Sequence, residues 1–454
     1  MSSQRISRFR WSILGRSAII LLGLFAVAAW GSGATSRSQA DRSASAERLL
    51  QEGLQDYRAH QLAQALAKLK RAYQLAPQNP KVRLALGLML YEEDPAGVEA
   101  QRLMESVAAL FPGNLELQLK LLDSYLQLKN TSKLSGLLRR LQDTMAGNTR
   151  FAFDVIYTLV RYGQLELAES QLDRVSARLQ PRLQGLAEQD LKSPARQTLV
   201  HAAGEVYFIR GMIAASRENK SEAMRLFQAA DHYDFPAPGS LQMQMLAEAL
   251  FRLKEYPLSI QAYETYLRHS PLDAAARMNL ALGYYANGMF ARARENLQKV
   301  LEQAPQTPNV HLYLGLALLE LKSNEEARRQ FEAELKVDPQ SYQAMAELAY
   351  LDYLAGDNEG CRRWLEKART LKPDWIETNM VFGLLYNRLG QFDRAIECLE
   401  RVIKERPNYY KAHYQLSLAY RRLGDETKAK EHADIYDRLI TEERSRQLGD
   451  RAPF

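Results

Sequence analysis

Cysteine and histidine are the side chains best suited to metal binding and nucleophilic chemistry, and the sequence holds 2 cysteines and 7 histidines. Cys361 and Cys398 cannot by themselves supply a four-cysteine zinc site, an iron–sulfur site or a disulfide framework. We expect two buried thiols, with a disulfide between them as the alternative. Phosphate-binding loops, dinucleotide fingerprints, zinc-protease helices and nucleophile elbows are all missing. The sequence therefore predicts no catalytic residue, no cofactor and no metal ligand, and we expect a protein that is not an enzyme.

The histidines do not gather at one place in the sequence. His311 and His413 occupy equivalent positions of a repeated pattern described below, and we interpret both as half-buried packing residues rather than ligands. His232 lies in a polar cluster at residues 231–234, where capping of a helix end or solvation is expected. Acidic pairs such as Glu325-Glu326 are expected on solvated helix faces, so no catalytic pair stands out.

Length, composition and charge exclude several classes of protein. The chain has 454 residues, of which 46% are hydrophobic and 25% charged, so it is neither disordered nor collagen-like. Its net charge is +6, but residues 1–45 hold six arginines and one aspartate, so only +1 remains for residues 46–454. A nucleic-acid binder usually carries a basic stripe on its folded part. We therefore expect no nucleic-acid partner.

The first 35 residues differ in kind from the rest. Arg5, Arg8, Arg10 and Arg16 precede an uncharged apolar run from Ser17 to Trp30. Such a segment is typical of a signal peptide, and when counted over residues 11–30 it is also long enough to anchor the chain in a membrane. Both alternatives stay open. Because the arginines stand before the apolar run, the N-terminus is expected in the cytoplasm and the body outside it, in the periplasm of a bacterium.

Five prolines reveal an internal repeat in the C-terminal half. Pro271, Pro305, Pro339, Pro373 and Pro407 follow one another at intervals of 34 residues. We number each repeat so that this proline is position 32, which starts the repeats at 240, 274, 308, 342, 376 and 410. Small residues then recur at position 8 (Ala247, Ala281, Gly315, Ala349, Gly383, Ser417) and at position 20 (Ser259, Ala293, Ala327, Cys361, Ala395, Ala429). Bulky residues recur at position 24 (Tyr263, Leu297, Phe331, Leu365, Leu399).

This pattern resembles the tetratricopeptide repeat, whose signature spaces a small residue, an alanine, a bulky residue and a proline in the same way. The resemblance implies an all-α fold, a right-handed superhelical solenoid of stacked antiparallel helix pairs, each pair sharing its core with its neighbours. The same frame returns upstream from Ala46, with weak repeats near 115–148 and 149–181.

The expected organisation follows from this frame. It comprises the signal or anchor segment (1–35), a flexible polar spacer (36–45), a partly degenerate repeat block (46–192), a join with one repeat (193–239), the regular repeats (240–443) and a polar tail (444–454).

The resemblance also implies a binding groove, because in this family first-helix positions 2, 5, 6, 9, 12 and 13 line the concave face. The corresponding side chains are Met278, Leu282, Tyr285, Leu312, Tyr313, Leu316, Leu319, Tyr350, Tyr353, Met380, Leu384, Asn387, Arg388, Tyr414, Arg421 and Arg422. They form an apolar, aromatic trough with a basic end, which suits an apolar peptide or helix with an acidic end. The alternative for each tyrosine is packing between neighbouring repeats.

Three functions are compatible with these features. We expect a protein-binding scaffold on the extracytoplasmic side of a bacterial membrane, held there by residues 11–30 if they are not cleaved. The second is an inner-membrane assembly factor of the cytochrome c maturation, lipopolysaccharide or pilus type. The third is an enzyme that uses its repeats to position a glycan, which the helical pattern leaves little room for.

Overall fold

The computed structural model describes residues 37–184 and 194–449, and in these two segments it contains 23 helices and no strand. The predicted all-α fold of stacked helix pairs is confirmed. The predicted export segment, residues 1–35, lies outside the described residues. In the described segments, no helix combines the length and the hydrophobicity that a membrane span requires.

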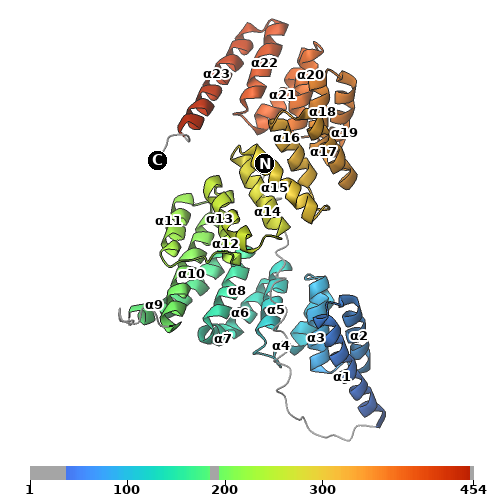
Figure 1. Cartoon of the computed structure of the whole chain (residues 1–454), viewed down its shortest axis with the longest axis vertical. Helices are drawn as coiled ribbons and strands as arrows, with labels where there is room; N and C mark the ends of the chain where they lie inside the picture. The colour runs from blue at the N-terminus through green and yellow to red at the C-terminus, as the bar shows by residue number, and fades with distance from the viewer. Residues whose placement is uncertain (1–36, 185–193, 450–454) are drawn as a thin grey trace. The chain divides into compact units, whose positions relative to one another are not determined.

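The chain forms two compact bodies, residues 1–235 and residues 236–454, which we describe separately. The N-terminal body (Figure 1, blue to green) contains eleven of the described helices. These are α1 (Arg37–Arg58), α2 (Leu62–Leu75), α3 (Pro80–Glu93), α4 (Val98–Ala108), α5 (Leu115–Gln127), α6 (Thr131–Arg140), α7 (Gln142–Gly147), α8 (Thr149–Arg161), α9 (Leu165–Gln184), α10 (Pro194–Ser216) and α11 (Lys220–Asp231).

The C-terminal body (Figure 1, yellow-green to red) contains six helix pairs that follow the predicted 34-residue frame. They are α12 (Leu241–Arg252) with α13 (Tyr256–His269), α14 (Ala274–Ala286) with α15 (Phe290–Gln303), α16 (Val310–Glu320) with α17 (Asn324–Val337), α18 (Tyr342–Ala355) with α19 (Asn358–Leu371), α20 (Ile376–Arg388) with α21 (Phe392–Glu405), and α22 (Tyr410–Leu423) with α23 (Glu426–Gly449).

Two expected boundaries differ from the structure. Helix α1 begins at Arg37, so most of the predicted flexible spacer, residues 36–45, is helical. Its alanines and arginines are good helix formers, and the helix that it begins continues into the core at Ala46, which is fully buried. The division between the two bodies falls at Phe235 and Pro236, so the repeat formed by α10 and α11 belongs to the N-terminal body.

The turn between the two helices of a repeat has the same backbone conformation in every repeat of the C-terminal body and in most pairs of the N-terminal body, the pair α3 and α4 being different. Position 15 has a positive φ in all six C-terminal repeats, at Lys254, Gly288, Lys322, Gly356, Gly390 and Gly424. In the N-terminal body the equivalent residues His60, Lys129, Gly163 and Glu218 also have a positive φ. Lys129 and Gly163 belong to the two weak repeats, so these segments form the same helix–turn–helix although they lack most marker residues.

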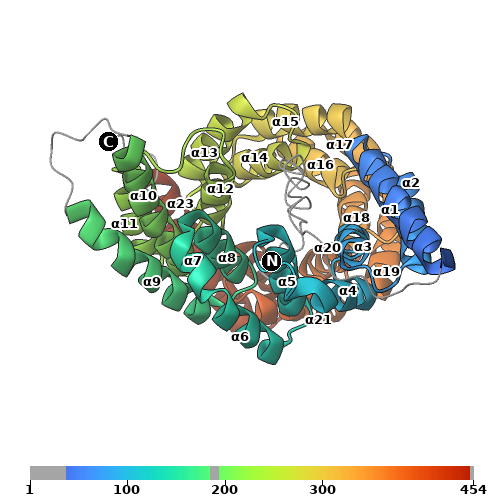
Figure 2. The same cartoon turned by 90° about the horizontal axis from the view of Figure 1, so that it is seen from below.

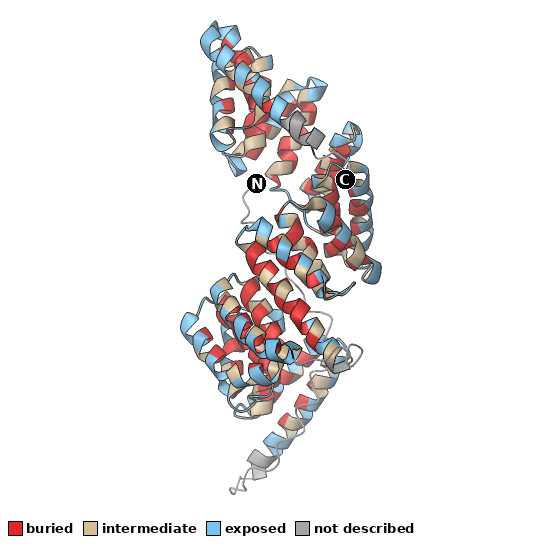
Figure 3. Cartoon of the chain, turned by 90° about the vertical axis from the view of Figure 1, so that its left-hand side faces the viewer, coloured by how far each residue is buried: buried red, intermediate tan, exposed pale blue. Residues whose placement is uncertain are grey.

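Each helix pair is held together by a small residue of the first helix facing a bulky residue of the second. A Cβ atom added to Gly315 would lie 2.5 Å from Cε1 of Phe331, and one added to Gly383 would lie 2.5 Å from Cδ2 of Leu399. At position 20 of the repeat that starts at 240, the Ser259 hydroxyl donates a hydrogen bond of 2.7 Å to the Ala247 carbonyl. The two helices therefore approach closely at positions 8, 20 and 24, and the buried residues line the contacts between helices (Figure 3).

Candidate functional site

The first helices of the C-terminal body form its inner face. Consecutive first helices contact one another, namely α12 and α14, α14 and α16, α18 and α20, and α20 and α22. Consecutive second helices make no contact of similar extent in this described part of the chain. Figure 2 shows α14 and α16 on the inner side of α15 and α17. Because the stack is tighter on the side of the first helices, that side is concave.

Tyr350, Tyr353 and Arg388 form one aromatic and cationic cluster on this face. The rings of Tyr350 and Tyr353 are stacked, with centroids 6.5 Å apart and planes 14° apart. The Arg388 guanidinium lies 3.5 Å from the centroid of the Tyr353 ring and also donates a hydrogen bond to the Tyr353 carbonyl. Both tyrosines remain partly exposed. The structure therefore brings these three predicted residues together, and Arg388 is fixed by its contacts with Tyr353.

Tyr285, Tyr313 and Leu316 lie on the next helices of the same face and are also partly exposed. The Tyr285 ring packs edge-on against Phe290, with centroids 5.4 Å apart. Burial raises the pKa of Tyr285 to about 12, and the negative charges of Glu320 and Glu347 contribute to this shift. Tyr285 is thus in the field of two carboxylates. Leu316 and Tyr313 also pack on the core between α14 and α18, so they are only partly available to a ligand.

The basic end of the face lies on α22 and is open. Arg421 and Arg422 are in the last turn of α22, and both are exposed. Tyr414 is 44% exposed, but one side of its ring contacts Tyr436 of α23, at a centroid distance of 5.3 Å. The two arginines are therefore accessible to an anionic group of a ligand, whereas one side of the Tyr414 ring is covered by the last helix.

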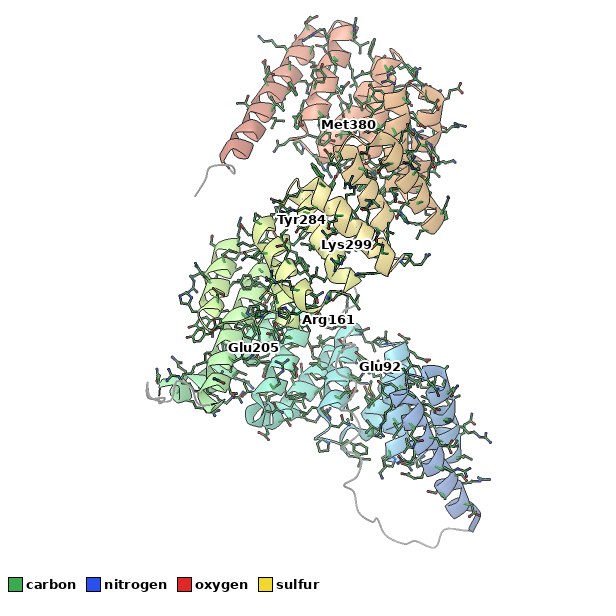
Figure 4. All side chains as sticks on the ribbon, in the orientation of Figure 1. Glu92, Arg161, Glu205, Tyr284, Lys299 and Met380 are labelled. Atoms are coloured by element: carbon green, nitrogen blue, oxygen red, sulfur yellow. The ribbon has the colours of Figure 1, made fainter. Side chains whose placement is uncertain are left out.

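Three residues expected in the groove are part of the core instead. Met278, Leu312 and Met380, all at position 5, are 4%, 5% and 7% exposed. Met380 lies among the helices of the C-terminal body in Figure 4. In these three repeats position 5 faces the neighbouring helices, and burial of the apolar side chains there is more favourable than their exposure to water. The side-chain amide of Asn387 already donates hydrogen bonds to the backbone and side-chain oxygens of Gln415, so its N–H groups are used within the protein.

Three glutamates of the same face were missed by the sequence analysis, which considered only apolar, aromatic and basic side chains. Glu347, Glu320 and Glu377 occupy positions 6, 13 and 2 of their repeats, which are groove positions by the rule stated above. Burial, together with the negative charges of Glu377 and Glu320, raises the pKa of Glu347 to about 7. The middle of the face is therefore acidic, and the positional rule alone would have found these residues.

The histidines and cysteines have structural surroundings. His311 accepts or donates one hydrogen bond with Gln330, and His232 has one with the Gln228 carbonyl at the end of α11. His413 is buried and contacts His432 of α23 through the two Nδ1 atoms, 2.9 Å apart. Cys361 and Cys398 are free and buried, which agrees with the first of the two alternatives. Burial raises the pKa of both thiols, that of Cys361 to about 12.

Comparison with known proteins identifies the repeats of the C-terminal body. A family model described as tetratricopeptide repeat matches residues 245–306, 280–335, 314–374 and 381–441. The chain therefore contains tetratricopeptide repeats, as the marker residues indicated. Repeats of this kind serve as protein–protein interaction scaffolds, and the comparisons indicate no catalytic family.

Individual relatives are distant. The chain is 24% identical over 177 residues to a "Protein CTR9 homolog" of Arabidopsis thaliana; the match covers 38% of this chain and 16% of that protein's length. Among solved structures, that of MamA is 21% identical and matches 37% of this chain and 97% of that one, with a TM-score of 0.30. The Cut9 and Hcn1 hetero-tetramer is 12% identical and matches 88% of this chain and 95% of that one, with a TM-score of 0.42.

Proposed function

We propose that this protein is a scaffold on the extracytoplasmic side of a bacterial membrane and that it binds a segment of another protein along the concave face of residues 240–443. The segment is an apolar peptide or helix with an acidic end. Its apolar side chains pack against the tyrosines and leucines of the first helices, and its acidic end lies at Arg421 and Arg422.

The partly exposed row of Tyr313, Leu316, Tyr350 and Tyr353 is the observation that supports binding on this face. Tyrosine provides a large, rigid contact area together with a polar hydroxyl, and it is enriched at the centres of protein interfaces. The stacked pair Tyr350 and Tyr353 is held in place by Arg388, so little conformational entropy is lost when a ligand packs on it. A preorganised aromatic surface of this kind favours a bound peptide.

The location of the protein is argued from the sequence of residues 1–35 alone. Arginines before an apolar run favour export of everything that follows, whether the run is cleaved or retained. A reporter enzyme that is active only outside the cytoplasm, fused after Phe454, is expected to be active. Activity of a cytoplasm-specific reporter at the same position would contradict the proposed location.

Binding on the concave face is tested by affinity capture from native membranes. The intact protein and a Tyr350→Ala/Tyr353→Ala variant are compared, with Leu258→Ala/Leu371→Ala as the control. Leu258 and Leu371 lie on second helices and are 40% and 41% exposed, so their removal also deletes exposed apolar surface. We expect a partner that is lost only with the tyrosine variant. A partner that is lost with the leucine variant and kept by the tyrosine variant would contradict the proposal.

A further inference from the structure

One residue of α19 departs from the pattern of the regular repeats. Position 28 lies on the second helix, and in the repeats that another repeat follows it is occupied by Leu267, Leu301, Leu335, Arg369 and Ile403. The apolar side chains at this position are buried or pack on the core from its edge. A guanidinium cannot replace them there, because it must stay in contact with water or with a partner, and Arg369 is only partly buried. The space between α19 and the following repeat is therefore not filled as it is in the other repeats.

A pocket of about 180 Å³ lies at this place, between α19, α20 and α21. Helix α20 contributes Asn379 and Tyr386 to its lining, and the charged lining comes from second helices: Arg369 of α19 and Arg394, Glu397 and Arg401 of α21. Pockets for drug-sized ligands usually measure about 300–1,000 Å³, so this pocket admits one small group. Asn379 and Tyr386 occupy positions 4 and 11, which are not groove positions, so the pocket is separate from the concave face.

Two of the three guanidinium groups are held against aromatic rings. The guanidinium carbon of Arg369 lies 4.6 Å from the centroid of the Phe382 ring, and that of Arg394 lies 5.8 Å from the centroid of the Tyr386 ring. The two rings are stacked on each other, with centroids 5.6 Å apart and planes 16° apart. Contact with a ring restricts a guanidinium without neutralising its charge. Arg369 and Arg394 are therefore positioned at the pocket before any ligand binds.

The charged lining of the pocket is not balanced. Glu397 is the carboxylate of the lining, and it already pairs with Arg401 at 2.7 Å. Within residues 37–184 and 194–449, neither Arg369 nor Arg394 forms an ion pair. Arg394 donates a hydrogen bond of 3.1 Å to Oε1 of Gln391, which is neutral. Three positive charges and one negative charge give the lining a net charge of +2, which an anion with two negative charges would neutralise.

We propose that this pocket, which we name the arginine pocket (Arg369, Arg394, Glu397 and Arg401), binds a phosphate group, either as the free ion or as a phosphate monoester. Guanidinium N–H groups donate strong, charge-assisted hydrogen bonds to phosphate oxygens. The second pKa of a phosphate monoester is about 6, so at neutral pH the group is largely a dianion and matches the net charge of the pocket. A single carboxylate would leave one guanidinium without a counter-charge. The arginine pocket does not depend on the proposed function, because its charged residues lie on second helices.

The test is isothermal titration calorimetry of the purified full chain with sodium phosphate at pH 8, with sodium chloride added to hold the ionic strength constant. We expect saturable binding at one site per chain. The affinity is expected to fall at least about tenfold for Arg369→Leu, because hydrogen bonds to charged groups contribute about 1.5–3 kcal/mol. Leucine is the residue type that other repeats have at position 28, so this variant is expected to fold, and circular dichroism checks that it does.

Two further variants separate the pocket from a general effect of charge. Arg394→Gln changes an exposed residue of α21 and is expected to weaken phosphate binding by a similar factor. The matched control is Arg363→Leu, which makes the same change as Arg369→Leu at an exposed residue of α19 outside the pocket and is expected to leave the affinity unchanged. The absence of saturable phosphate binding, or equal affinities of Arg369→Leu and Arg363→Leu, would overturn the inference. Sodium acetate that binds as tightly as phosphate would overturn the assignment of the ligand.

The source of the phosphate group is distinguished with lipid vesicles. Phosphatidic acid carries a phosphate monoester as its headgroup, so vesicles of phosphatidylcholine with phosphatidic acid are compared with vesicles of phosphatidylcholine alone by flotation. Residues 1–35 are the same in wild type and variants, so only the difference between wild type and Arg369→Leu is interpreted. If Arg369→Leu weakens both phosphate binding and the preference for phosphatidic acid, the pocket accepts a lipid headgroup. If it weakens phosphate binding alone, the pocket accepts a soluble phosphate. If it weakens neither, the inference is wrong.

Discussion

Replacement of Gly315 by leucine tests the packing within a helix pair. The first added atom, Cβ, would lie 2.5 Å from Cε1 of Phe331 and 2.8 Å from its Cδ1 and Cζ. Phe331 is fully buried, so its ring cannot move into solvent. Overpacking typically costs 1–3 kcal/mol, and the overlap at the first atom favours the upper end of that range. Leucine gains about 1 kcal/mol in helix propensity over glycine, which leaves a net loss of about 2 kcal/mol.

The assay is urea-induced unfolding of the full chain followed by circular dichroism, with the midpoint of the transition as the readout. The double variant Gly315→Leu/Phe331→Ala is expected to be more stable than the sum of the two single changes by at least about 1 kcal/mol, because the leucine occupies the space of the ring. In the control Gly136→Ala, a Cβ would meet no atom within 4 Å, so a small gain in stability is expected. An unchanged midpoint for Gly315→Leu, or strict additivity, would refute the packing of position 8 against position 24.

Three further predictions concern other parts of the structure. Glu347→Gln is expected to stabilise the protein at pH 8 by about 1–2 kcal/mol and not at pH 4.5. The pKa of Glu347 is about 7 in the folded state in place of 4.5, so the folded state binds the proton more tightly than the unfolded state does. The stability of the wild type therefore falls as the pH rises between these values, by at most about 3.4 kcal/mol before solvent screening. Equal urea midpoints for wild type and variant at pH 8 would contradict this. Lys322→Gly removes a side chain from a residue with a φ of 63° and is expected to raise the melting temperature, whereas Gly288→Ala, at a φ of 74°, lowers it; the reverse order would count against the shared turn. Cys361 and Cys398 are expected to react with iodoacetamide only in urea, since both are buried and their pKa values are raised; mass spectrometry showing modification of the native protein would be the contrary result.

The repeat frame could be predicted from the sequence because its marker residues are imposed by close packing. Only a small side chain fits opposite Phe331 or Leu399, so Gly315 and Gly383 identify position 8 directly. The turn at position 15 was less visible, because Lys254 and Lys322 adopt a positive φ without being glycine. There the packing of two helices determines the backbone, and the residue type carries no signal.

The candidate site was predicted only in part. Tyr350, Tyr353 and Arg388 are grouped as expected because their positions follow the helix period. Position 5 could not be assigned correctly from spacing alone: whether a residue at the edge of a helix face is buried depends on the distance to the next helix, which the sequence does not specify. The raised pKa of Glu347 depends on burial and on the charges of carboxylates in two other repeats, which become evident only once the helices are stacked.

Site-specific photo-crosslinking in living cells tests the central claim, that the first-helix face binds a polypeptide. The crosslinker p-benzoylphenylalanine replaces Tyr313 or Tyr353 on the concave face, or Leu258 or Leu371 on second helices. The account predicts a crosslinked partner from both tyrosine positions and none from the leucine positions. Crosslinks that form only from Leu258 and Leu371 would contradict it.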